Sequence, residues 1–371
     1  MFDFSRSDTS LFGRWWWTVD KVLLAAFFIM IAFGIMMTMA ATPVVANRIG
    51  LEEFYFLKRH LFYLIPTGLT IFYISNLDNN QLKKFALGLY AGAVFLTLLT
   101  LFFGTEIKGA HRWITFCGLS IQPSEFAKPS LAIITAWMFA NQQKDSQFRG
   151  KFLAAIFFAI FALLLVMQPD IGMLIVTLAT WFIQLFANGL PIFFVVSIAG
   201  LCAAGFAGAY LFLPHVTVRV DEFLNPKIGD HYQINRSLEA FSNGGWFGVG
   251  PGEGIVKKHL PDAHADFVFA VLGEEFGFIF CLFMVMLIAF IVIYGTLKIF
   301  KSSNYFSNIA LIGLLSQFGL QSAINIASSL HLIPTKGMTL PFISYGGSSM
   351  LASAVTIGMI LALSKKNISL K

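Results

Sequence analysis

The chain has 371 residues, of which 57% are hydrophobic and 12% are charged, and its mean hydropathy is +0.76. These values exclude a water-soluble globular protein and predict an integral membrane protein. The formal net charge of +6 does not indicate a nucleic-acid partner, because Lys and Arg are denser in the segments predicted to face the cytoplasm.

A helix that spans a bilayer needs about 20 mostly apolar residues, and ten segments meet or approach that length. They are 22–42, 60–76, 85–103, 124–141, 152–167, 171–187, 190–213, 266–298, 306–330 and 346–364. The apolar core of the first segment is longer than that of a signal peptide, so we interpret it as a retained span. Trp15, Trp16 and Trp17 before it are typical of an aromatic interfacial anchor, and a packed cluster is the alternative. The predicted fold class is all-α, a polytopic membrane protein with ten transmembrane helices.

The distribution of basic residues predicts that both termini are cytoplasmic. Residues 1–21 and 365–371 are then cytoplasmic segments, and 22–364 form the membrane domain. The long connections all fall on the outer side, and the longest is the extracytoplasmic loop 214–265 between the seventh and eighth helices. Because long irregular segments in compact proteins are usually functional, the chemistry is expected at the outer surface.

The outer connection before the fourth span contains GAHRWI and QPSEFAK. Ser124 is predicted to cap the next helix, and Glu125 and Lys128 are predicted to form an i, i+3 ion pair. Arg112 lies close to the membrane interface, where either snorkelling or a functional role explains it.

A tight turn, QPDIG, joins the fifth and sixth spans. Pro169 ends one helix, and Asp170 is predicted to cap the next one.

The long outer loop has two recognisable parts. Residues 232–241 carry apolar side chains at 234, 238 and 241, which predicts a short amphipathic helix on the outer leaflet. The glycine-rich run 243–254, NGGWFGVGPGEG, could cradle a phosphate, but no strand precedes it, and a mobile loop is the favoured interpretation.

Carboxylates crowd the start of the eighth span in HLPDAHADFVFAVLGEEFG. Asp266 is predicted to begin the helix at the outer surface, either as a helix cap or as a catalytic group. Glu274 and Glu275 lie about 12–14 Å deeper at 1.5 Å per residue. They point to different sides, so at least one is expected to be a structural charge with a basic partner or a proton.

Residues 333–349, IPTKGMTLPFISYGGSS, are too broken to span and too apolar for a free loop. A re-entrant segment buried against protein at the membrane surface is the physical solution. Lys336 is its cation.

Together these motifs resemble the SEDS family (shape, elongation, division and sporulation) over essentially the whole chain. The Lys336 segment and GPGEGIVKKHLPDAH resemble the cell-division members more than the elongation members. The resemblance implies a ten-helix peptidoglycan glycosyltransferase that joins lipid II units at the division septum. It also implies that Asp266 is the essential aspartate of an H-T-D-F motif, in which this chain has Ala265 in place of the threonine.

The chemistry implied by the resemblance agrees with these residues. Asp266 would be the general base for a sugar hydroxyl, because a hydroxyl is a weak nucleophile. The departing undecaprenyl pyrophosphate calls for cations or for a divalent ion such as Mg²⁺ or Mn²⁺. No residue pattern indicates a metal site of the protein's own. The expected substrate-binding residues are Arg112, Lys128, Lys336, Glu125, His264 and Ser344.

The resemblance also implies a class B penicillin-binding protein as transpeptidase partner, together with other division proteins and no nucleic acid. Two other classes of function remain open. A lipid II flippase would need a polar route to both faces, whereas the unusual residues crowd the outer third of the chain. A division scaffold would need large docking surfaces, whereas the cytoplasmic connections are short.

Overall fold

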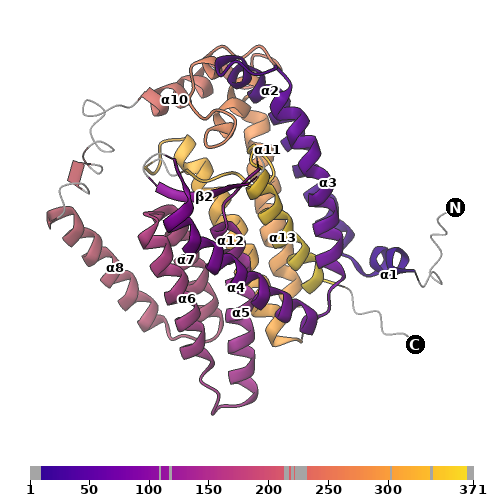
Figure 1. Cartoon of the computed structure of the whole chain (residues 1–371), viewed down its shortest axis with the longest axis vertical. Coiled ribbons are helices and arrows are strands. Elements are labelled where there is room, and N and C mark those ends of the chain that lie inside the picture. The colour runs from indigo at the N-terminus through magenta and orange to yellow at the C-terminus, as the bar shows by residue number, and fades with distance from the viewer. Residues whose placement is uncertain are drawn as a thin grey trace.

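The computed structural model describes residues 10–107, 110–116, 119–212, 217–218, 221, 232–300, 303–334 and 337–365. Each of the ten predicted spans corresponds to one helix (Figure 1). These helices are α2 (Lys21–Arg48), α3 (Tyr55–Asn76), α4 (Asn79–Phe103), α5 (Ser124–Lys144), α6 (Gly150–Met167), α7 (Ile171–Ala187), α8 (Ile192–Phe212), α11 (Val268–Ile299), α12 (Tyr305–Ser329) and α13 (Gly347–Leu363).

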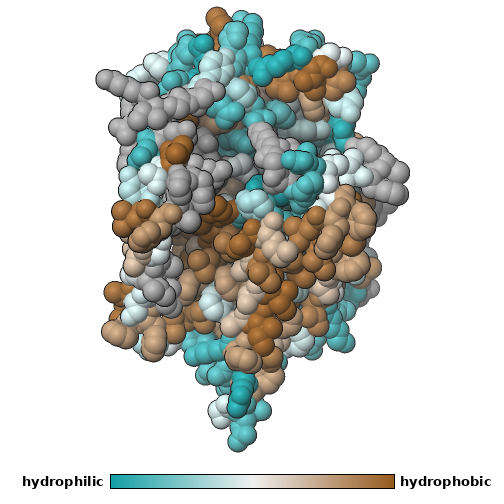
Figure 2. Space-filling model, turned by 60° about the vertical axis from the view of Figure 1, so that its left-hand side comes forward, coloured by the Kyte–Doolittle hydropathy of each residue, from teal (hydrophilic) through white to brown (hydrophobic). Residues whose placement is uncertain are grey.

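Within the described residues, five helices are long and apolar enough to cross a membrane by length and composition: α2, α4, α6, α11 and α12. For α3, α5, α7, α8 and α13 a membrane span stays a prediction. Figure 2 shows a broad hydrophobic band between two hydrophilic ends, the pattern of a bundle set across a bilayer. The chain is therefore an all-α, multi-pass membrane protein.

The outer end of the bundle carries the smaller elements. Three short strands, β1 (Thr105–Ile107), β2 (Ala110–Phe116) and β3 (Leu119–Ile121), form an antiparallel sheet in the order β1-β2-β3. The hydropathy pattern did not predict this sheet, because its strands are too short to show a periodicity. The short helix α10 (Tyr232–Gly244) and the 3₁₀ turn η1 (Val256–Lys258) also lie here, whereas α1 (Leu11–Thr18) lies near the opposite end (Figure 1).

Residues 232–241 are helical, as predicted, but the buried face differs from the expected one. Ser237, Ala240 and Gly244 are buried, whereas Leu238 is exposed. A Cβ on Gly244 would lie 1.9 Å from the Gly273 carbonyl oxygen, so only glycine permits this close approach of α10 to α11. The small residues, together with the half-buried Phe241, whose ring lies 5.8 Å from the Phe269 ring, therefore hold α10 on the bundle.

The predicted helix cap at Asp170 is confirmed, and the one at Ser124 is wrong. The Asp170 carboxylate accepts a hydrogen bond from the Met173 amide at 3.2 Å, as predicted for a cap of α7. Ser124 is instead the first residue of α5, after Pro123 in the cap position, and its buried hydroxyl has no partner among the described residues.

The glycine-rich run 243–254 does not form the expected mobile loop. It is held by backbone hydrogen bonds to α11 at Gly277, where that helix is kinked. The amides of Val249 and Gly250 donate to the carbonyls of Glu274 and Glu275, each at 3.0 Å. The loop thereby replaces hydrogen bonds that α11 loses at its break.

Candidate functional site

Asp266 lies at the outer end of the bundle, in the turn that leads into α11. The helix begins at Val268 with Phe267 in the cap position, so Asp266 is not the helix cap. Its side chain is partly exposed. Its backbone carbonyl accepts a hydrogen bond from the Asn325 amide nitrogen at 3.1 Å, which fixes the turn to α12.

The irregular segment between α12 and α13 packs against this turn. A Cβ on Gly337 would lie 3.4 Å from the Asp266 Oδ2 atom, so the carboxylate faces the segment at a point without a side chain. The Ser344 hydroxyl donates to the Ala265 carbonyl at 2.6 Å and accepts from the Leu340 amide at 2.8 Å. The Tyr345 amide donates to the His264 carbonyl at 2.8 Å. The described part of this segment is largely buried, as a re-entrant segment should be.

His264 forms the other side of the Asp266 turn. Its ring lies 5.5 Å from the Phe56 ring and 5.7 Å from the Tyr345 ring, measured between centroids. Burial lowers the pKa of this imidazole. The negative charge of Asp262 raises this pKa, and the positive charge of Arg48 lowers it. Its Nδ1 atom is buried without a hydrogen-bond partner in the described part of the chain.

Glu125 and Lys128 form the predicted ion pair on α5, with 2.9 Å between Nζ and Oε2. The Lys128 side chain is only 1% exposed. Its ammonium also donates to Gln321 Oε1 at 2.8 Å, and the Gln321 amide nitrogen donates to the Thr339 carbonyl at 3.1 Å. Hydrogen bonds therefore connect the Glu125–Lys128 pair to the segment that faces Asp266.

Arg112 on β2 reaches the turn between α6 and α7. Its guanidinium donates to the Gln168 carbonyl at 3.2 Å and to the Pro169 carbonyl at 2.7 Å, and its Nε lies 3.7 Å from the Asp170 carboxylate. Burial raises the pKa of Asp170, and the positive charge of Arg112 opposes this shift. The Arg112 side chain is 28% exposed. Arg112 is thus held in place by hydrogen bonds to the turn, and part of its side chain is still exposed to solvent.

The structure brings together His264, Asp266 and Ser344 directly, and connects Glu125 and Lys128 to them. Arg112 belongs to the neighbouring Asp170 cluster. Lys336 falls outside the described residues.

Two polar residues of this site were not predicted: Gln321 and Asn325 on α12. The Asn325 amide nitrogen donates to Met338 at 2.6 Å as well as to Asp266. Together with Gln317, these residues recur every four positions within an apolar helix, so they share one face. Polar side chains at helical spacing inside a predicted span are the signal that could have found them.

Glu274 and Glu275 are both structural. The Glu274 carboxylate accepts from the amides of Val256 and Lys257 at 2.7 and 2.8 Å, and from Asn243 at 3.0 Å. Glu275 pairs with the Lys257 ammonium. The two side chains are at most 1% exposed, so neither faces the substrate side.

Asp266 therefore belongs to a polar network at the outer end of a membrane bundle. Its carboxylate can accept a proton, and the turn that carries it is held from two sides. Such an arrangement is suited to general base catalysis near the membrane surface.

The family model described as "Cell cycle protein", which covers FtsW, RodA and SpoVE, matches residues 20–368. The chain is 41% identical over 364 residues to a Caulobacter vibrioides protein named "Probable peptidoglycan glycosyltransferase FtsW", an alignment that covers 98% of this chain and 93% of that protein. An Escherichia coli protein of the same name is 32% identical over 93% of this chain and 85% of its own length.

Solved structures agree with these sequence relatives. A chain from "Structural coordination of polymerization and crosslinking by a peptidoglycan synthase complex" superposes with a TM-score of 0.79 at 26% identity, covering 93% of this chain and 97% of that one. The rod shape determining protein RodA of Thermus thermophilus gives a TM-score of 0.69 at 25% identity, with coverages of 93% and 96%. The chain therefore belongs to the FtsW/RodA/SpoVE family of cell cycle proteins, as its resemblance to the SEDS family predicts.

Proposed function

We propose that this chain is a peptidoglycan glycosyltransferase of cell division, which polymerises lipid II with the Asp266 carboxylate as general base. The names of the FtsW relatives support the reaction class. The observation that supports the base is the position of Asp266, partly exposed at the outer end of the bundle and facing Gly337.

The reaction requires one proton transfer and one substitution. Asp266 takes the proton from the 4-hydroxyl of the acceptor sugar, and that oxygen attacks the anomeric carbon of the donor. The bond from the anomeric carbon to the pyrophosphate oxygen breaks, the configuration inverts from α to β, and undecaprenyl pyrophosphate leaves with the electron pair. A carboxylate held within hydrogen-bond reach of the hydroxyl contributes about 10²–10⁴-fold to such a step.

The other site residues have supporting roles in this proposal. Ser344 and His264 hold the turn and the facing segment against each other through the hydrogen bonds above. Arg112 and Lys336 would counter the charge of the pyrophosphate, and Arg112 is the first candidate because guanidinium binds phosphate oxygens bidentately. Lys128 is 1% exposed and would act through its charge and not by direct contact. Glu125 fixes the Lys128 ammonium.

A divalent cation at the pyrophosphate would neutralise negative charge on the leaving group. Within the described residues, no group of three His, Cys, Asp or Glu side chains could hold a metal ion. The proton transfer described above does not depend on such an ion.

The proposed partner is a class B penicillin-binding protein that crosslinks the new strands, with other division proteins in the same assembly. A peptidoglycan synthase complex among the similar structures supports this pairing. The chain is a multi-pass inner-membrane protein by family and helix content. We further propose cytoplasmic termini and a septal location.

The test is polymerisation of lipid II by the purified protein with its transpeptidase partner. We expect Asp266→Ala and Asp266→Asn to lower the rate by at least about 100-fold, because both remove the base. Asp262→Asn is the matched control, since Asp262 lies in the same turn at a positive φ of 52°, which asparagine tolerates.

Full polymerisation by a folded Asp266 variant would remove this residue from the mechanism. Flipping of lipid II in liposomes, measured on the same variants, separates the enzyme from the flippase alternative. A flippase would move lipid II in the absence of polymer synthesis, whereas the proposed enzyme would polymerise lipid II without moving it between leaflets.

A further inference from the structure

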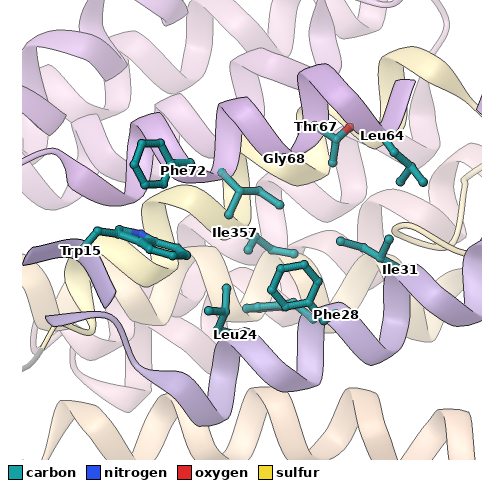
Figure 3. A pocket seen from close by; sticks show the side chains of 11 residues that line it. Trp15, Leu24, Phe28, Ile31, Leu64, Thr67, Gly68, Phe72 and Ile357 are labelled. Carbon is teal, nitrogen blue, oxygen red and sulfur yellow. The ribbon is translucent and has the colours of Figure 1, made fainter. Parts of the chain in front are cut away.

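An apolar groove of about 240 Å³ lies between α2 and α3 and extends toward α1, where Trp15 lines it (Figure 3). Leu24, Phe28 and Ile31 of α2 form one wall, and Leu64 and Phe72 of α3 form the other. Thr67 is its one polar lining residue. A groove with so few polar atoms in its lining is suited to an apolar ligand.

A glycine of α3, Gly68, is part of the groove lining. A Cβ on Gly68 would meet no heavy atom within 4 Å. Other glycines here are required by close packing: a Cβ on Gly34 would lie 1.9 Å from the Phe342 carbonyl oxygen. At Gly68, in contrast, an added methyl group would clash with no neighbour. Packing therefore does not explain this glycine, which destabilises the interior of a helix. The space at Gly68 is therefore available to a molecule from outside the chain.

Helix α1 closes one end of the groove. The Trp15 ring lies 5.1 Å from the Phe72 ring, and its Nε1 atom donates to the Ser75 hydroxyl at 2.7 Å. Trp15 is thus a packed residue, whereas Phe28 at the rim is 59% exposed. The groove is closed by Trp15 at the surface end and opens sideways to the hydrocarbon.

A cation lies beside this closed end. The Lys21 ammonium is 4.8 Å from the Trp16 ring and 4.7 Å from the Trp17 ring, and the residue is exposed. The adjacent Asp20 does not neutralise it, because the Asp20 carboxylate pairs with Lys298. Tryptophan and lysine side chains at a membrane interface are suited to phosphate headgroups.

We propose that this groove binds one acyl chain of an anionic glycerophospholipid, with the phosphate of the lipid at Lys21. The lipid comes from the leaflet that α1 faces, opposite to Asp266. The apolar walls and the empty position at Gly68 select the acyl chain, and the Lys21 charge selects an anionic headgroup. This site is separate from the proposed catalytic site and does not depend on the reaction assigned to it.

The test uses the full-length protein in nanodiscs that contain phosphatidylglycerol with a photoactivatable diazirine in its acyl chain. Peptide mapping after irradiation locates the labelled residues. Gly68→Leu fills the groove, and Gly88→Leu on α4 is the matched control, because a Cβ there also meets nothing within 4 Å. We expect labelling of the groove-lining residues Leu64, Thr67 and Phe72 in the wild type and in Gly88→Leu, whereas the exposed Ile65 and Leu69 report contact with bulk lipid.

In Gly68→Leu this labelling should be lost, because the leucine side chain occupies the space in the groove that the acyl chain would take. Lys21→Gln should lower labelling by phosphatidylglycerol and leave labelling by a zwitterionic phosphatidylcholine probe unchanged. The proposal is overturned if Gly68→Leu labels like the wild type. It is also overturned if undecaprenyl phosphate, and not phosphatidylglycerol, competes with the probe.

Discussion

The Lys257 ammonium contacts the Glu275 carboxylate in a place where neither side chain is more than 3% exposed. Lys257 also donates to the Ala40 carbonyl on α2 at 2.9 Å and to the Gly252 carbonyl at 3.2 Å. One buried cation therefore joins α2, α11 and the outer loop. It explains why the chain places a carboxylate inside a helix that is otherwise apolar.

Removal of one partner of this pair should be costly. Lys257→Met leaves Glu275 buried without its cation, and we expect a loss of about 3–5 kcal/mol in the free energy of unfolding. The double variant Lys257→Met/Glu275→Gln should recover part of this loss, because no unpaired charge remains. Thermal unfolding in detergent of the wild type, both single variants and the double variant gives the coupling energy. Equal losses in Lys257→Met and in the double variant would contradict this account.

The kink of α11 depends on one glycine. Gly277 has φ 79° and ψ −178°, a backbone conformation that is essentially restricted to glycine. A Cβ there would lie 2.4 Å from the Gly248 amide nitrogen. Gly277→Ala is therefore expected to cost more than the about 1–3 kcal/mol of backbone strain alone, measured as a lower melting temperature.

The matched control for Gly277→Ala is Gly88→Ala, in a regular helix with no neighbour near the added methyl group. It should leave the melting temperature unchanged or raise it slightly, because alanine is the better helix former. If Gly277→Ala melts like Gly88→Ala, the outer loop can move away from α11 without cost, and the backbone hydrogen bonds between them do not stabilise the bundle.

Hydropathy predicted the helices well because a membrane helix leaves a long apolar run in the sequence. All ten predicted segments coincide with helices, and Asp170 caps α7 as expected. The interactions of the outer loop could not be predicted from the sequence, for a physical reason. The side-chain partners of Glu274 and Glu275 come from α10 and η1, 17 to 31 residues away, and no periodicity connects such positions.

In the candidate site, too, local contacts could be predicted from the sequence and contacts between distant segments could not. The ion pair of Glu125 and Lys128 followed from helical spacing. The contact of Asp266 with the segment before α13 depends on the packing of three helices. No local sequence pattern predicts that packing. Asn325, which joins the two, could have been found as a polar residue on an apolar helix.

Ser344 is a positioning residue in the proposed site. Its hydroxyl connects the Leu340 amide to the Ala265 carbonyl, one residue before Asp266. Ser344→Ala would leave the buried amide without a partner, at a cost of about 1–3 kcal/mol. We expect kcat for lipid II polymerisation to fall with little change in KM, because the base is displaced and the substrate contacts remain.

Ser344→Thr keeps the hydroxyl and should retain more activity than Ser344→Ala. Ser120→Ala is the control, since Ser120 is exposed and its hydroxyl forms a hydrogen bond with the Thr115 hydroxyl on the neighbouring strand. If Ser344→Ala keeps the wild-type kcat, the Asp266 turn does not depend on this contact.

His264 should make the stability of the protein depend on pH. Burial lowers the pKa of this imidazole below its ordinary value of 6.5. The unfolded chain then binds a proton at a higher pH than the folded chain does, so the free energy of unfolding decreases as the pH falls below about 6.5. The loss continues down to the pKa of the folded state and is absent above pH 7.5, where the imidazole is neutral in both states.

Melting temperatures of the wild type and of His264→Phe, measured between pH 5 and pH 8, test this dependence. Phenylalanine keeps an aromatic ring between Phe56 and Tyr345 and cannot be protonated. The wild type should lose stability relative to His264→Phe as the pH falls from 7.5 to 5, and the difference between them should be constant above pH 7.5. A difference that does not change with pH would mean that the imidazole has the same proton affinity in the folded and unfolded states, and that the aromatic packing does not disfavour its charge.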